Sequence, residues 1–101
     1  MNPTLPSRIG RTTKRKDIHG RPVVYTVVDE DVFVAPTNSD KAFAIHKLKF
    51  SDGRTEFRIG YYMIAQRPRV KGKWAWGQYA PMMTKEEMAE IFSRVKAKRW
   101  I

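Results

Sequence analysis

The chain of 101 residues contains no cysteine. This absence excludes disulfides, thiolate zinc sites and cysteine nucleophiles. No apolar run approaches the roughly 20 residues of a transmembrane helix. The first residues also lack the apolar core of a signal peptide. We therefore expect a soluble, cytoplasmic protein with no membrane partner.

Acidic residues are scarce. The chain has 20 Lys and Arg against 10 Asp and Glu, which gives a formal net charge of +10 and a pI near 10.2. Such an excess points to a polyanionic partner, although a protein that is basic only for solubility is the alternative. Hydrophobic residues make up 42% and aromatic residues 12%, which is typical of a folded domain. Charge and aromatic content together favour nucleic acid over an acidic membrane surface.

Catalytic motifs are missing as well. The sequence has no phosphate-binding glycine loop, zinc-ligand spacing or nucleophile elbow. His46 alternates with apolar residues, which is typical of a packed histidine rather than a catalytic one. We therefore predict no catalysis, no cofactor and no metal. A small metal-dependent nuclease that uses Asp29 or Asp31 is the remaining enzymatic alternative.

The segment of residues 67–79 carries the clearest functional signal. Cations stand at alternate positions and aromatic residues follow them: Arg67, Arg69, Lys71 and Lys73, then Trp74, Trp76 and Tyr79. Cations neutralise phosphates, and flat rings stack on bases with about 1–3 kcal/mol per base. We therefore predict that this segment binds nucleic acid, preferably single-stranded. Filling a core under a helix is the other role open to the two tryptophans.

Residues 1–21 are predicted to form a basic, flexible tail, because they hold two prolines and six cations but little that is apolar. Such an arm either contacts phosphates or is an unused terminus. Residues 22–101 are predicted to form a single domain.

This domain is predicted to be α+β, with an antiparallel sheet of about four to five strands followed by one C-terminal helix. Residues 23–28 and 32–35 are rich in β-branched side chains and predict a hairpin with an acidic turn. Residues 42–50 and 54–64 predict a second hairpin around Asp52-Gly53, the pair that a two-residue type I′ turn prefers. Residues 74–80 predict a fifth strand.

A two-residue turn would fix the register of the second hairpin and therefore its two faces. Lys47 would lie opposite Arg58, and Lys49 would share their basic, solvated face with Tyr62. These four residues join the predicted nucleic-acid surface. The other face would pack against the helix, and it would hold His46, Leu48, Phe50, Phe57, Ile59, Tyr61 and Met63.

The C-terminal helix is predicted to begin after Thr84. Thr84 and Glu87 have the spacing of a capping box. The apolar stripe expected to pack on the sheet consists of Met88, Ile91, Phe92 and Val95. Trp100 and Ile101 are expected either to close the core or to form a dimer contact.

The order of elements resembles the positive-cofactor-four family of transcriptional coactivators. The resemblance rests on Glu56-Phe-Arg-Ile-Gly-Tyr-Tyr-Met63, on the basic glycine-containing loop through Lys73, and on the strand leading to Thr84-Lys-Glu-Glu-Met88. It covers residues 42–98 and implies a homodimer that binds single-stranded DNA through its curved sheets. A transcription-related role and association with the nucleoid are further expectations for such a protein. The alternative is a protein-interaction module, such as an accessory or inhibitor protein, that dimerises through its C-terminal helix.

Overall fold

The computed structural model describes residues 4–77 and 80–101. Five strands come first along the chain and one helix follows. Their bounds are β1 Thr12–Lys16, β2 Pro22–Ala35, β3 Asn38–Phe50, β4 Thr55–Ile64, β5 Trp74–Trp76 and α1 Lys85–Ala97. The strands form one antiparallel sheet in the order β1-β2-β3-β4-β5. The predicted α+β class, with a C-terminal helix after the sheet, is confirmed.

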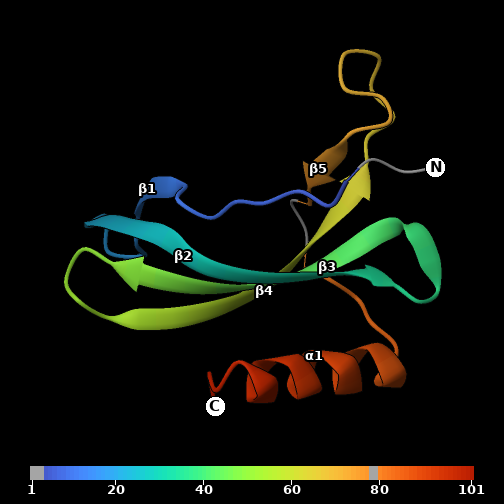
Figure 1. Cartoon of the computed structure of the whole chain (residues 1–101). Helices are drawn as coiled ribbons and strands as arrows, with labels where there is room; N and C mark the ends of the chain where they lie inside the picture. Colours follow the sequence, from blue (N-terminus) through green and yellow to red (C-terminus); the bar gives the residue numbers. More distant parts are fainter. Residues whose placement is uncertain (1–3, 78–79) are drawn as a thin grey trace.

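The sheet curls, so that β1 and β5 lie on one side of its long central strands and α1 lies on the other (Figure 1). We call the surface toward α1 the helix face. It carries Phe33, Phe43 and Ile45, which pack with Ile91 of α1 in one buried cluster. We call the opposite surface the inner face. It carries two further clusters, one around Val27 and Leu48 and one around Tyr62 with Ala42 and Ala44.

The helix begins as predicted. Thr84 caps α1, its side chain accepts from the Glu87 N–H, and the Glu87 carboxylate accepts from the Thr84 N–H. The predicted apolar stripe is only half right, because Ile91 is buried while Met88 is 44% and Phe92 55% exposed. Ion pairs from α1 to β2 turn the helix so that Ile91 points at the sheet and the Met88–Phe92 flank faces outward.

The predicted first hairpin is wrong, because residues 22–35 form the single strand β2. Its acidic residues do not form a turn but alternate between the two faces of the sheet. Asp29 and Asp31 point to the helix face, where they pair with Lys98 at 3.5 Å and Arg94 at 2.7 Å. Glu30 points to the inner face. Docking of α1 therefore places acids in the middle of a strand, and a β-bulge between Val27 and Asp29 accommodates them.

The predicted register of the second hairpin is also wrong by one residue. Its loop has three residues, 51–53, because the Phe50 N–H donates to the Arg54 carbonyl at 2.9 Å. Gly53 takes φ of 95°, the left-handed conformation that closes such a loop. His46 therefore lies opposite Arg58, and Lys47 lies opposite Phe57. A slip of one residue moves each side chain of one strand to the other face relative to its partner.

Part of the predicted tail is ordered as β1, which pairs with β2 from Thr12↔Thr26 to Lys16↔Pro22. The threonine hydroxyls of the first pair lie 2.8 Å apart. Just before β1, the Gly10 N–H donates to the Val27 carbonyl at 2.8 Å. The prediction of a flexible arm is therefore wrong for residues 10–16, because a β-branched β2 edge offers them a strand to pair with.

Candidate nucleic-acid interface

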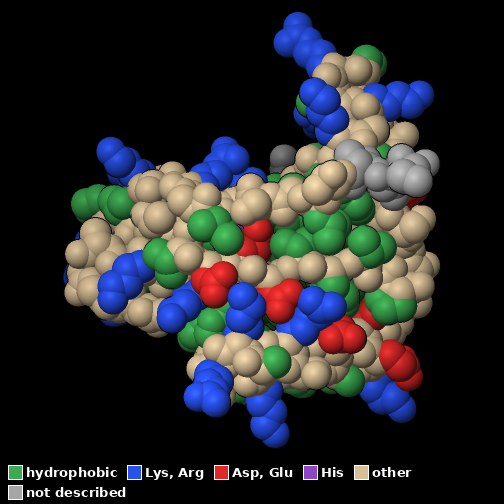
Figure 2. Space-filling model, in the orientation of Figure 1, with side chains coloured by type: hydrophobic (Ala, Val, Ile, Leu, Met, Phe, Trp, Pro, Cys, Tyr) green, Lys and Arg blue, Asp and Glu red, His purple; other side chains and the backbone are tan. Residues whose placement is uncertain are grey.

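The loop between β4 and β5 stands out from the rest of the molecule, and Lys and Arg side chains project from it (Figures 1 and 2). The Ala65 N–H donates to the Lys73 carbonyl at 2.8 Å, and the Gly72 N–H donates back to Ala65 at 3.0 Å. These bonds close the loop at its base, where Gly72 takes φ of 83°. The loop is therefore a compact hairpin extension rather than an open segment.

All four predicted loop cations are exposed: Arg67, Arg69, Lys71 and Lys73. None of the ion pairs found among residues 4–77 and 80–101 involves them. Exposed cations of β1, namely Lys14, Arg15 and Lys16, lie on the same side of the sheet, away from α1 (Figure 1). This side therefore offers positive charge that the protein's own acids leave uncompensated.

The two tryptophans face the core. Trp74 and Trp76 share one face of β5, as predicted, and both are half-buried against Ala42, Ala44 and Tyr62. The Trp76 ring lies over Gly60 so closely that a Cβ there would come within 2.2 Å of it. Trp76 also stacks on His46, with ring centroids 4.9 Å apart. Both tryptophan rings therefore pack mainly in the core. Tyr79, which was also predicted to stack on bases, lies outside the described residues.

Gly77 lies directly against the ring of Tyr61 in β4. A Cβ on Gly77 would lie 2.2 Å from the Tyr61 ring, so this ring fills the space that the missing side chain leaves. The glycine thus allows the residue that follows β5 to pack closely against β4.

Arg58 and Tyr62 belong to a polar network inside the inner face rather than to an open basic surface. Tyr62 is 2% exposed, and its hydroxyl donates to the Glu30 carboxylate at 2.7 Å. Glu30 also accepts from the fully buried His46 ring and from the Arg8 N–H. Arg58 donates to His46 Nδ1 at 2.9 Å and to the Tyr25 hydroxyl at 3.0 Å. Tyr62 is therefore buried rather than on an open binding surface, and Arg58 is half-buried within the network.

The surroundings of Glu30, Tyr62 and Arg8 shift the pKa values of all three side chains. Burial raises the pKa of Glu30, but hydrogen bonds from His46, Tyr62 and Arg8 outweigh it and leave that pKa below its ordinary value. Burial and the bond to Glu30 raise the pKa of Tyr62, so its hydroxyl stays protonated and donates. Burial lowers the pKa of Arg8, whose guanidinium lies 5.1 Å from the Trp76 ring centroid.

The remaining predicted cations, Lys47 and Lys49, point to the helix face, opposite in direction to Arg58. Lys47 is half-buried and Lys49 is exposed. The structure therefore brings the four loop cations together but separates them from the predicted sheet cations. The Glu30–His46–Arg58–Tyr62 network was missed from the sequence, because its members meet only in the true register. The available signal was that Glu30, His46 and Arg58 each lie within a segment rich in strand-forming residues.

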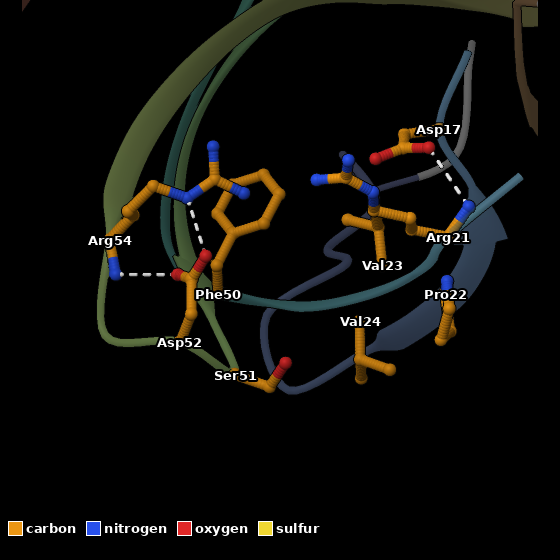
Figure 3. Close-up of a pocket in the computed structure, with 9 residues that line it drawn as sticks. All are labelled: Asp17, Arg21, Pro22, Val23, Val24, Phe50, Ser51, Asp52 and Arg54. Carbon is orange, nitrogen blue, oxygen red and sulfur yellow. Dashed lines mark hydrogen bonds and ion pairs between the residues drawn. The ribbon is translucent and has the colours of Figure 1, made fainter. Parts of the chain in front are cut away.

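A cleft of about 470 Å³ lies between the β1–β2 turn and the β3–β4 turn (Figure 3). Arg54 on one wall is held by Asp52 and Glu56 at 2.8 Å each, and its guanidinium lies over Phe50. On the other wall, Asp17 accepts from the Arg21 N–H at 2.9 Å. Because acids line both walls, the cleft is a poorer site for phosphate than the loop.

Comparison with protein-family models, with curated proteins and with solved structures gave no significant match. Across the described residues, no group of three or more His, Asp or Glu side chains is placed to hold a metal ion. In that same part of the chain, α1 is too short and too polar to cross a membrane.

Proposed function

We propose that this protein binds nucleic acid, preferably single-stranded, through the loop of residues 67–73. The observation that carries the proposal is the set of four exposed loop cations that no acid of the described chain neutralises. Binding releases the counterions of the phosphates that these cations contact, which favours association most at low salt.

The position of the loop supports the same proposal. Because its backbone is closed by hydrogen bonds at Ala65 and Gly72, little further ordering of the loop is needed on binding. A protruding loop reaches the backbone of an unpaired strand without having to match the shape of a duplex. Trp74 directly follows the loop cations in the sequence and is only half-buried, so part of its surface is open to a base. No step of catalysis is part of the proposal.

Fluorescence anisotropy of labelled oligonucleotides tests it. Single-stranded DNA, single-stranded RNA and duplex DNA are titrated at low salt with the wild type and with the double variant Lys71→Glu/Lys73→Glu. We expect the double variant to lose at least about ten-fold in affinity, because each reversed charge now repels a phosphate. The matched control is Lys85→Glu/Lys96→Glu, which makes the same change of net charge on exposed positions of α1.

The two variants separate a local effect from a general one. An equal loss in both would show that only net charge matters and would remove the loop from the proposal. Absence of micromolar binding to any of the three nucleic acids would reject nucleic-acid binding altogether.

A further inference from the structure

Among residues 4–77 and 80–101, the outer edge of β4 has a strand partner only toward its C-terminal end. In the described chain, β5 pairs only with Tyr62–Ile64, and the Gly77 N–H adds one bond to the Tyr61 carbonyl. The described chain resumes at Ala80 beside Lys41 and Met63, so it does not return to the first half of β4. No segment of the described chain therefore pairs with residues 55–60 on the side away from β3 (Figure 1).

The hydrogen bonds of Arg54 and Tyr61 show which backbone N–H and C=O groups of β4 point away from β3. The Arg54 carbonyl points toward β3, because it accepts from the Phe50 N–H, and the Tyr61 carbonyl points away from it. Backbone groups alternate along an antiparallel strand, so Thr55, Phe57 and Ile59 point their N–H and C=O groups outward. An edge with three open residues is a template for another strand.

This edge is complementary to itself. In an antiparallel pair centred on Phe57, each copy's Phe57 faces the other, and Thr55 faces Ile59. All outward N–H and C=O groups of these three residues then find partners across the axis. Glu56 of each copy lies opposite Arg58 of the other, so the Glu56 carboxylate, which is paired with Arg54 in its own copy, would also lie near the half-buried Arg58 guanidinium on the inner face.

The side chains on the helix face match the same arrangement. Phe57 is 45% and Ile59 42% exposed, although both lie on the surface that α1 partly covers. Phe57 already touches Trp100, with ring centroids 5.6 Å apart. Pairing two β4 edges would place these apolar side chains against their counterparts and remove them from water.

We propose that this protein forms a homodimer by antiparallel pairing of two β4 edges, in the register that sets Phe57 against Phe57. The partner is thus a second copy of this chain, and the interface is the sheet edge rather than the outer flank of α1. The assembly is one continuous sheet with two basic loops. This inference does not depend on nucleic-acid binding.

The lack of cysteine in the wild type allows a direct test by cross-linking. In the proposed register the two Cα atoms of residue 57 lie about 5.5 Å apart, which is within reach of a disulfide. We expect Phe57→Cys to form a disulfide-linked dimer under mild oxidation at least about ten-fold faster than Thr55→Cys. In this register residue 55 of one copy faces residue 59 of the other, so the two cysteines of Thr55→Cys would be separated by about four residues along the strands. Phe92→Cys, on the exposed flank of α1, reports the alternative helix-mediated dimer.

Light scattering of the untagged wild type provides the second measurement. We expect twice the monomer mass of 11.8 kDa, and we expect Ile59→Pro, which removes one outward N–H, to return the protein to the monomer. Circular dichroism tests whether Ile59→Pro keeps its fold. If that variant unfolds, Phe57→Lys is used in its place to disrupt the same edge. A monomeric wild type, or fastest cross-linking through Phe92→Cys, would overturn the proposal.

Discussion

Glu30 is the residue on which the inner face depends most. Its side chain is 2% exposed, yet it accepts hydrogen bonds from the His46 ring, the Tyr62 hydroxyl and the Arg8 N–H. Because His46 Nδ1 accepts from the Arg58 guanidinium, the proton that His46 donates to Glu30 is on Nε2. One carboxylate thus joins β2, β3, β4 and the segment before β1.

We predict that Glu30→Gln lowers the free energy of unfolding by about 3 kcal/mol, because a neutral amide oxygen cannot satisfy three converging donors. Urea unfolding at neutral pH, followed by tryptophan fluorescence, measures the change. Glu86→Gln, an exposed carboxylate on α1, is the control and should change stability little. A loss equal to that of the control would mean that the network contributes nothing net.

The same residue predicts a pH dependence. The pKa of Glu30 is lowered in the folded protein from its ordinary value of 4.5. Its stabilisation is therefore complete above pH 4.5 and is lost as the pH falls through the lowered folded pKa. We expect the wild type to lose stability in this acid range and Glu30→Gln to lose less of it. Parallel pH profiles for the two proteins would contradict this assignment.

Whether Trp74 and Trp76 are buried or open to solvent could not be predicted from the sequence. Alternation placed Trp74 and Trp76 on one face correctly, but it could not say whether that face was open. The answer depends on Gly60 of β4, which leaves room for the Trp76 ring, and on His46, which stacks on it. These neighbours come from strands whose register the sequence alone did not fix.

At the scale of elements, α1 is the part that the sequence predicted best, because its start is encoded locally. The capping box needs only Thr84 and Glu87, three residues apart, and both of its hydrogen bonds form. Glu87 also accepts from the Thr37 hydroxyl at 3.1 Å, which ties the start of α1 to the β2–β3 turn. Local chemistry of this kind is readable without knowledge of tertiary packing.

We predict that Thr84→Ala lowers the free energy of unfolding by about 1 kcal/mol, because the Glu87 N–H loses its side-chain acceptor. Thr84→Ser keeps a hydroxyl in the same place and should stay close to the wild type. Urea unfolding of the three proteins, followed by far-ultraviolet circular dichroism, provides the comparison. Equal losses in the alanine and serine variants would show that the cap is not what stabilises this end.

The strands were harder to predict, because their pairing depends on distant partners. An acidic trio normally marks a turn, but here Asp29 and Asp31 stay in β2 since Lys98 and Arg94 of α1 neutralise them. Asp52-Gly53 did mark a turn, yet the addition of Ser51 to the loop shifted every pair by one residue. Such a shift was enough to bury Tyr62 and to place Arg58, half-buried, against His46 of the inner network.

For the whole molecule, the position of the acids matters more than the net charge of +10. Acidic and basic side chains alternate along the seam between sheet and helix (Figure 2), where Asp31 and Glu90 share Arg94. The loop of residues 67–73 has no such compensation among the described residues. Asp29, Asp31 and Glu30 thus help to hold α1 and the inner network in place, while the four loop cations have no acid partner in the described chain.

This division predicts the salt dependence of binding. If the four loop cations each contact a phosphate of a single strand, they should contribute about 3 to the slope of log affinity against log salt, at about 0.7 per contact. Arg67→Gln/Arg69→Gln removes two contacts without adding repulsion, so we expect its slope to be smaller by about 1.4. Anisotropy titrations over a salt series give the slopes.

Lys85→Gln/Lys96→Gln on α1 is the matched control, since it lowers the net charge equally on the opposite side of the sheet. Its slope should equal that of the wild type, because cations that touch no phosphate release no counterions. A slope reduced to the same extent in both variants would place the bound strand along both sides of the molecule. It would then be the overall field of the protein, rather than the loop, that holds the nucleic acid.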